Sequence, residues 1–125
     1  MTDGVVGAAM KLLLAALAVA ALLMAGCSTP KATVPDQDEQ GRYEIHMTSA
    51  NRFMPAHAKV PVNATVVWIN DASVHDVTAH DGSWESPRNM KAGTSYEHRF
   101  TAAGEVAYHC ELHASQGMTG KVIVG

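Results

Sequence analysis

The sequence predicts an all-β fold, an antiparallel sandwich of about seven or eight strands within residues 41–125. Apolar and polar residues alternate in short runs, and turn residues separate these runs. After Gly41 no stretch shows the 3.6-residue spacing of an amphipathic helix. That number of short strands in 85 residues is typical of two sheets packed around one core.

Each predicted strand has its own alternation. The segment Thr65 to Ile69 is apolar on both faces, which indicates a central strand. Turns are expected at 70–73, 81–83, 91–94 and 102–105, where small and polar residues gather. In order, the strand candidates are Tyr43/Ile45/Met47, Val60/Val62, Thr65 to Ile69, Val74 to Ala79, Tyr96/His98/Phe100, Val106/Tyr108/Cys110 and Val122/Val124.

The N-terminus has the pattern of a secretory signal, which predicts a signal peptide over residues 1–26. An apolar run of 13 residues from Leu12 to Met24 follows Lys11. A membrane-spanning helix needs about 20 such residues, so this run is short for a span. Met10, directly before the charged residue, is a more natural start than Met1. The alternative is an uncleaved signal anchor over residues 5–26.

The small residues before Cys27 resemble the lipobox of bacterial lipoproteins, in which the cysteine becomes the lipidated first residue of the mature protein. Residues 27–40 would then be a lipidated cysteine and a flexible tether. Ser28 to Gln40 has two prolines, four charges and almost no apolar content, so it has little to bury. Both interpretations of the N-terminus place the domain outside the cytoplasm on a membrane, either periplasmic or on the outer cell surface.

Lipidation of Cys27 would leave Cys110 as the only thiol in a compartment where cysteines usually pair. A metal site explains that thiol better than inert burial, because His113 and Met118 follow within eight residues. Thiolate and thioether are soft donors for Cu(I), and imidazole binds both copper oxidation states. Among seven histidines, His75 is the best candidate for a second imidazole, because it opens a predicted strand directly after a turn.

These residues carry a resemblance to the small cupredoxins of the plastocyanin, amicyanin and halocyanin type, over about residues 42–125. The matching segments are Val67-Trp68-Ile69-Asn70-Asp71, Val74-His75-Asp76-Val77, Asp81-Gly82-Ser83-Trp84-Glu85-Ser86 and Cys110-x2-His113-x4-Met118-x-Gly120.

The resemblance implies a cupredoxin-like Greek-key β-sandwich with one type 1 copper. His75, Cys110 and His113 would be the equatorial ligands, and Met118 the weak axial ligand. It also implies a carrier of single electrons between extracytoplasmic redox proteins, a donor and an acceptor, and not an enzyme. Nucleic acid is not an expected partner, because 9 Lys and Arg stand against 12 Asp and Glu.

Two neighbours of the ligands, Asp76 and Leu112, depart from the family pattern. Asp76 stands where these proteins usually carry Asn; its backbone N–H is expected to reach the Cys110 sulfur, and its carboxylate to favour Cu(II). Leu112 stands where plastocyanin has Pro. Trp68 and Trp84 are expected to pack in the core rather than to carry electrons.

His80 and His109 support a different hypothesis. The spacing His75-x4-His80 joined to the pair His109-Cys110 resembles copper nitrite reductases, in which the residues equivalent to His80 and His109 bind a second copper in an oligomer. This implies a nitrite-reductase-like or oxidase-like enzyme as an alternative. His80 lies about 17 Å along a regular strand from His75, so the sequence favours two separate surface histidines. Copper storage or delivery is the remaining alternative.

Overall fold

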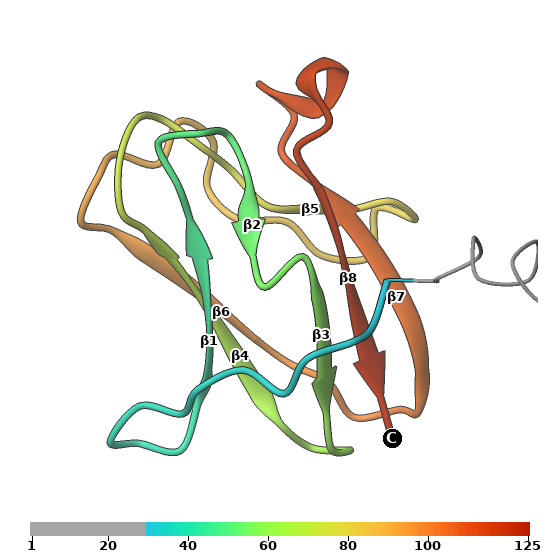
Figure 1. The fold of residues 1–125 in the computed structure, drawn as a ribbon. Helices are drawn as coiled ribbons and strands as arrows, with labels where there is room; N and C mark the ends of the chain where they lie inside the picture. Colours follow the sequence, from blue (N-terminus) through green and yellow to red (C-terminus); the bar gives the residue numbers. More distant parts are fainter. Residues whose placement is uncertain (1–29) are drawn as a thin grey trace, which may run out of the picture. The chain divides into compact units, whose positions relative to one another are not determined.

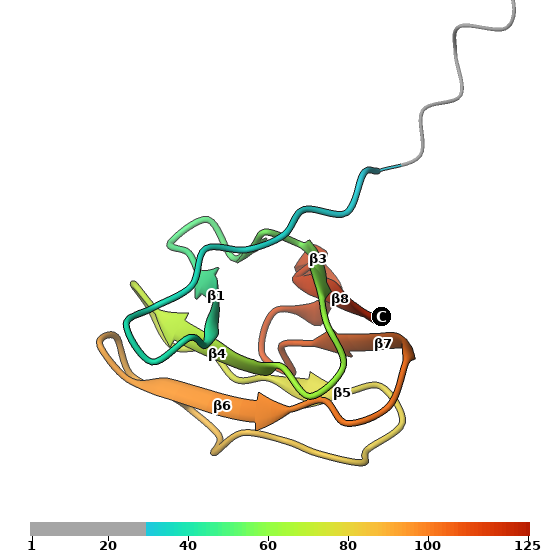
Figure 2. The ribbon, with the colours of Figure 1, turned by 90° about the horizontal axis from the view of Figure 1, so that it is seen from below.

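The computed structural model describes residues 30–125 and confirms the all-β prediction (Figure 1). Within these residues eight strands form two four-stranded sheets that face each other across one core (Figure 2). A single 3₁₀ turn, η1 (Ala114–Gln116), lies between the last two strands. The strands are β1 (Tyr43–Met47), β2 (Phe53–Met54), β3 (His57–Val60), β4 (Thr65–Asn70), β5 (Thr78–Ala79), β6 (Ser95–Arg99), β7 (Gly104–His109) and β8 (Thr119–Val124).

The two sheets are mixed, which corrects the prediction of an antiparallel sandwich. One sheet has the order β2-β1-β4-β6 and the other the order β3-β8-β7-β5. β1 runs parallel to β4, and β3 runs parallel to β8. Alternation of apolar residues specifies which face of a strand is buried, but it does not specify which strand lies beside it. The chain crosses between sheets, and sequence-distant strands become parallel neighbours.

The core is aromatic at its centre. Trp68 on β4 is fully buried, as expected for a strand with neighbours on both sides. Its ring packs edge-to-face on Tyr108 of β7, with ring centroids 5.3 Å apart, and lies 5.4 Å from Trp84. Both tryptophans therefore pack in or against the core. The close approach of Tyr108 to Gly120 leaves no room there for a side chain, since a Cβ on Gly120 would overlap the Tyr108 ring.

The segment 74–79 differs from the prediction, because only Thr78 and Ala79 form a strand. His75, Asp76 and Val77 are all buried, whereas an extended strand turns alternate side chains outward. This irregular backbone makes a single bridge to Met90 at His75. The strand β2 was not predicted either, because it is only two residues long.

Residues 33–40 are bound to the sandwich, so the flexible tether predicted over residues 27–40 does not extend through this part of the chain. Thr33 forms a parallel bridge to Ala58, with its backbone N–H on the His57 carbonyl. Pro35 is buried, and the Asp38 carboxylate accepts from Arg42 at 2.7 Å. Backbone hydrogen bonds, which do not depend on side-chain type, hold this segment together with the buried Pro35.

The predicted signal peptide and Cys27 lie outside the described residues. Over residues 30–125 there is no helix with the length and apolar character that crossing a membrane requires.

Candidate metal centre

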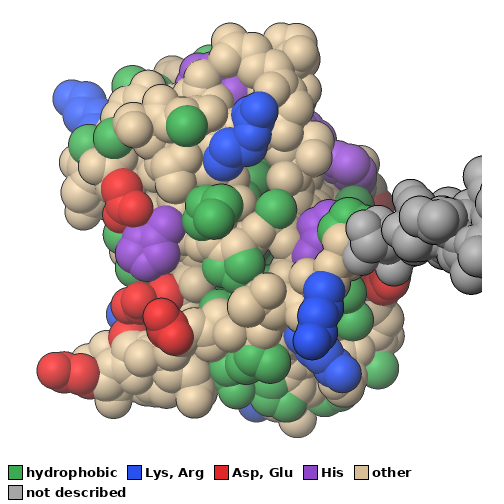
Figure 3. Space-filling view, in the orientation of Figure 1, with side chains coloured by type: hydrophobic (Ala, Val, Ile, Leu, Met, Phe, Trp, Pro, Cys, Tyr) green, Lys and Arg blue, Asp and Glu red, His purple; other side chains and the backbone are tan. Residues whose placement is uncertain are grey.

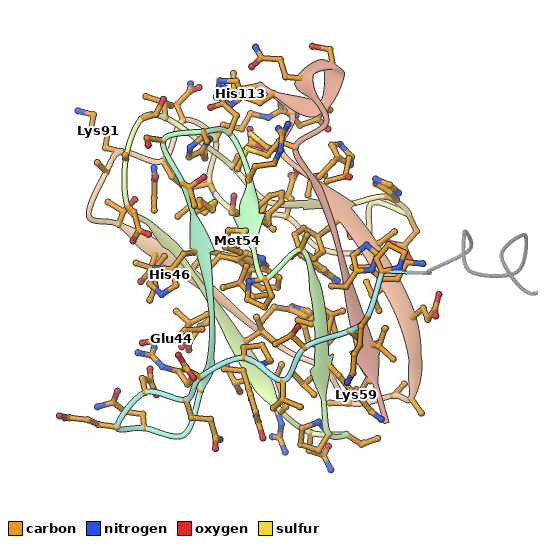
Figure 4. The ribbon with its side chains drawn as sticks, viewed as in Figure 1. Glu44, His46, Met54, Lys59, Lys91 and His113 are labelled. Atoms are coloured by element: carbon orange, nitrogen blue, oxygen red, sulfur yellow. The ribbon has the colours of Figure 1, made fainter. Side chains whose placement is uncertain are left out.

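Three of the predicted ligands meet at one end of the sandwich. One donor atom from each of His75, Cys110 and His113 lies within 4.8 Å of the other two. The Nδ1 atoms of the two histidines are 3.2 Å apart, and the Cys110 Sγ lies 3.6 Å from the His113 Nδ1. Figure 4 labels His113 at this end of the molecule. The three donors therefore converge on a point that one metal ion could occupy.

The ligands come from two loops at the same end of the sheets. Cys110 follows directly after β7, where Tyr108 and Cys110 face the core and His109 faces outward. The loop then turns back on itself, with the Cys110 N–H on the Met118 carbonyl at 3.1 Å and the Met118 N–H on the His113 carbonyl at 3.2 Å. His113 lies at the start of η1 and is only partly buried.

His75 is held in one orientation by a backbone carbonyl. Its Nε2 lies 3.0 Å from the Thr48 carbonyl oxygen, which can only accept a hydrogen. The Nε2 must therefore carry the proton, and the Nδ1 lone pair is left to face His113 and Cys110. Burial lowers the pKa of His75, so the ring is kept neutral, the form that binds a metal. The sequence could not indicate Thr48, because the contact uses only its main chain.

The Cys110 thiol is fully buried, and burial raises its pKa. Hydrogen bonds from the backbone N–H groups of Asp76, His113 and Leu112 to the sulfur lower the pKa of the thiol. A thiol in this environment is not a reactive surface nucleophile. It is deprotonated when a metal replaces its proton, which is how thiolate ligands bind.

Asp76 connects the two ligand loops. Its carboxylate is 2% exposed and accepts a hydrogen bond from the Glu111 backbone N–H at 2.6 Å. Asp76 follows His75 in the chain, and Glu111 follows Cys110, so this bond fixes the distance between the neighbours of two ligands. The negative charge also acts on the sulfur, where it raises the Cys110 pKa.

Met118 is fully buried in the same apolar cluster as Cys110. Its backbone closes the ligand loop, because its carbonyl accepts from the Cys110 N–H and its own N–H donates to the His113 carbonyl. The thioether is a weak, soft donor, the type that completes a His₂Cys copper site from the axial direction. Its role as the axial ligand stays a prediction.

Comparison with known proteins agrees with this geometry. Residues 40–125 match the family of copper binding proteins described as the plastocyanin/azurin family. The chain belongs to this family. It is a cupredoxin, and the donor set above is the part of it that fits copper.

Individual relatives cover the domain to different extents. The chain is 36% identical over 97 residues to halocyanin from Natronomonas pharaonis, covering 70% of this chain and 60% of that protein. It is 31% identical to amicyanin from Paracoccus denitrificans, covering 89% of this chain and 92% of amicyanin. The chain thus spans about three fifths of the halocyanin. A solved structure of an oxidized amicyanin variant superposes with a TM-score of 0.61 at 28% identity, covering 77% of this chain and all of that one.

A copper-containing nitrite reductase from Thermus scotoductus also resembles this cupredoxin. The TM-score is 0.59 at 25% identity, and the match covers 84% of this chain but 26% of that enzyme. The similarity is therefore to a quarter of the reductase and carries no activity by itself.

Copper fits the residues of this cupredoxin. Two neutral imidazoles and one buried thiolate suit both Cu(II) and Cu(I), and the surrounding core excludes water. The Asp76 and Thr48 hydrogen bonds hold the donors in place before any metal arrives. A site whose ligands need not move when the oxidation state changes is suited to rapid electron exchange.

His80 and His109 are also close together. Their ring centroids are 4.8 Å apart, and the His109 Nε2 lies 3.1 Å from the Glu111 carboxylate. The sequence favoured two surface histidines because a regular strand would carry His80 about 17 Å from His75. Residues 74–77 do not form a regular strand, and the two rings meet; whether they bind a metal stays a prediction. β5 instead pairs with β7, and the His80 N–H bonds to the Ala107 carbonyl at 3.0 Å. This pair lies on the outer face of the sheet, and the structure does not bring it into the His75 cluster.

Two of the remaining three histidines have side-chain partners. His46 bonds to the Asp71 carboxylate at 2.9 Å, and this bond raises its pKa. His98 stacks on Trp84 with ring centroids 4.8 Å apart, and burial lowers its pKa. His57 begins β3.

Proposed function

We propose that this cupredoxin is a membrane-tethered carrier of single electrons between extracytoplasmic redox proteins. The observation that supports it most is the convergence of His75, Cys110 and His113 with only His113 partly exposed. Bound copper would supply the change between Cu(II) and Cu(I). The protein orients the donors, keeps water away from the thiolate, and presents one imidazole edge near the surface.

The surroundings of His113 support direct contact with a partner. The apolar side chains of Leu112 and Val74 are 46% and 39% exposed at this end. Ala114 and Gly117 are exposed as well. A small apolar surface with little charge at its centre suits transient docking, because it loses little hydration on contact.

A test of this function is electron self-exchange between the oxidised and reduced protein. Ala114→Glu places a charge in the apolar surface without touching a ligand. We expect the variant to exchange electrons more slowly and to keep the wild-type visible spectrum. Equal exchange rates would place the electron entry elsewhere, and a protein that takes up no copper would reject the carrier proposal.

The tether forms a separate part of the proposal. Cys27 follows a signal-like apolar run, and the halocyanin and amicyanin resemblance suits an extracytoplasmic protein. Cys27→Ala should prevent lipidation and either release the protein from membranes or leave a larger precursor. An unchanged mass and unchanged membrane extraction would reject lipid anchoring at Cys27.

A second candidate function uses His80 and His109, whose 4.8 Å ring separation favours it. The pair could hold a second copper, with another histidine supplied by a neighbouring subunit, in a nitrite-reductase-like or oxidase-like oligomer. The protein should then bind a second metal and reduce nitrite or dioxygen. His80→Ala/His109→Ala should remove that metal and leave the blue colour. Binding of one metal per chain in every oligomeric state would reject it.

Copper storage or delivery has less support from the side chains. Storage sites use several accessible thioethers, whereas Met90 is buried beside His75 and Met54 is exposed on β2.

A further inference from the structure

The charges of residues 30–125 are unevenly distributed, and the end that carries the metal centre has exposed basic side chains near His113 (Figure 4). The chain has a formal net charge of −3. Acidic side chains gather towards the opposite end, where Figure 3 shows red groups together and Figure 4 labels Glu44. Figure 4 labels Lys91 towards the same end of the molecule as His113.

Three exposed basic residues belong to the metal end, and they are called here the cationic rim: Arg52, Arg88 and Lys91. Arg52 is placed by η1, because its guanidinium donates to the Gln116 carbonyl at 3.1 Å. Lys91 is placed by His75, because it follows Met90, whose N–H and carbonyl both pair with the His75 backbone. Arg88 and Lys91 line one shallow surface pocket.

No member of the cationic rim forms an ion pair within residues 30–125, where the ion pairs use other basic groups. The acidic groups near the metal end bond to other neighbours or are buried, and none of them pairs with the cationic rim. Asp71 bonds to His46 at 2.9 Å, and Glu111 bonds to His109 at 3.1 Å. The third, Asp76, is buried. The rim charges are therefore available to an incoming molecule.

The acidic end is arranged differently. Arg42 bonds there to both Asp38 and Glu97 at 2.7 Å, so this basic group is neutralised by its neighbours. Lys59, towards the same end (Figure 4), forms no ion pair within residues 30–125. At an ionic strength of 0.1–0.15 M, charges interact over about 8–10 Å. A partner at the metal end therefore experiences the rim more strongly than the net charge of the whole protein.

We propose that this cupredoxin docks redox proteins whose own docking face is acidic, and that Arg52, Arg88 and Lys91 steer them onto the apolar surface at His113. This inference rests on the proposed carrier function and adds the class of partner. Charge complementarity around an apolar centre speeds the encounter and fixes orientation, while the apolar contact keeps the complex short-lived.

The experiment uses ferricyanide as an anionic probe on the purified, reduced full chain. Ferricyanide takes one electron from the protein and becomes ferrocyanide, and the return of the visible band measures the rate. The net negative charge alone predicts repulsion, so the rate would rise with ionic strength. The cationic rim predicts attraction, so the rate should fall as salt increases. Oxidation by the cationic tris(phenanthroline)cobalt(III) should not show this fall.

Matched variants separate the rim from the net charge. Lys91→Glu and Lys59→Glu change the net charge equally, and Figure 4 labels Lys59 towards the end opposite His113. We expect Lys91→Glu to slow ferricyanide oxidation about threefold at low salt and Lys59→Glu to change it little. A rate that rises with salt, or equal slowing by the two variants, would overturn the proposal.

A second measurement needs no electron transfer. The paramagnetic anion hexacyanochromate(III) should broaden backbone NMR signals around Arg52 and Lys91 before those around Lys59. Broadening centred on Lys59 or spread evenly would overturn the cationic rim. Because this measurement can be made on the metal-free or the Cu(I) protein, a protein that failed to carry electrons would reject the proposed function and still report on the rim.

Discussion

The His75–His113 and His80–His109 pairs have nearly the same spacing and different surroundings. Their ring centroids are 5.0 Å and 4.8 Å apart. His75 is buried, has its tautomer fixed by a carbonyl, and faces a buried thiol. His80 is exposed on the outer face, and the nearest charged group to its partner is the Glu111 carboxylate.

The difference shows that two neighbouring imidazoles do not by themselves determine a metal site. A soft thiolate, a low-dielectric environment and fixed ring orientations favour a copper ion that changes oxidation state. Two imidazoles beside a carboxylate at the surface form a harder, more hydrated donor set. Such a set suits a divalent ion held weakly unless another subunit completes the site.

Among the predictions, the largest effect is expected from removal of the Cys110 thiolate, the ligand that distinguishes the His75–His113 pair from the His80–His109 pair. Cys110→Ala should abolish the intense visible band of the Cu(II) protein, because that band arises from thiolate-to-copper charge transfer. Circular dichroism should show an unchanged β fold. Absorption and electron paramagnetic resonance spectra measure the loss, and a retained visible band would show that the ligand assignment is wrong.

Gly120→Ala should destabilise the packing of β7 against β8, the two strands that flank the loop with Cys110 and His113. The new methyl group would meet the Tyr108 ring, so we expect a loss of about 2–3 kcal/mol in the free energy of unfolding. Gly82→Ala is the control, because Gly82 has a φ of +73° but open space around it, and it should cost about 1 kcal/mol. Urea denaturation compares them; a Gly120→Ala cost no greater than the control's would argue against tight packing at Tyr108.

Removing a negative charge beside each histidine pair should change the copper reduction potential by different amounts. Asp76→Asn keeps the size of the side chain and removes a negative charge buried next to His75 and Cys110. The reduction potential should rise by tens of millivolts, equivalent to about 1–2 kcal/mol. Glu111→Gln removes a more exposed charge beside His109 and should shift the potential less. Voltammetry of both variants checks the order, and a larger shift for Glu111→Gln would contradict it.

The smallest expected effect concerns His46, a histidine paired with carboxylates and not with a second imidazole. The Asp71 hydrogen bond raises the pKa of His46 above its ordinary 6.5. Its contribution to stability should be fully present below pH 6.5 and be lost as pH rises through the raised folded pKa. Because the pair is exposed, the contribution should be at most about 0.5 kcal/mol.

The measurement is urea denaturation of the wild type and of His46→Gln at pH 5.5 and pH 8.5. The variant should lose stability relative to the wild type at the lower pH only. A larger loss at pH 8.5 would have the wrong sign for a raised pKa.

The sequence predicted most of what depends on residue type and spacing. The all-β class followed from alternation, and the spacing from Cys110 to Met118 indicated a copper loop. The contacts that position the ligands could not be predicted in the same way. The Thr48 carbonyl is a main-chain group with no sequence signature, and the irregular backbone at residues 74–77 depends on burial of consecutive side chains. The same irregularity explains why the approach of His80 to His109 was not expected.

The central claim is that His75, Cys110 and His113 hold one redox-active copper. Titration of the copper-free protein with Cu(II), followed by absorption and electron paramagnetic resonance, tests it most directly. We expect a thiolate charge-transfer band that saturates at one copper per chain, both in the wild type and in His80→Ala/His109→Ala. Absence of that band at saturation, or its loss in the double variant, would contradict the assignment of the buried pair as the electron-carrying site.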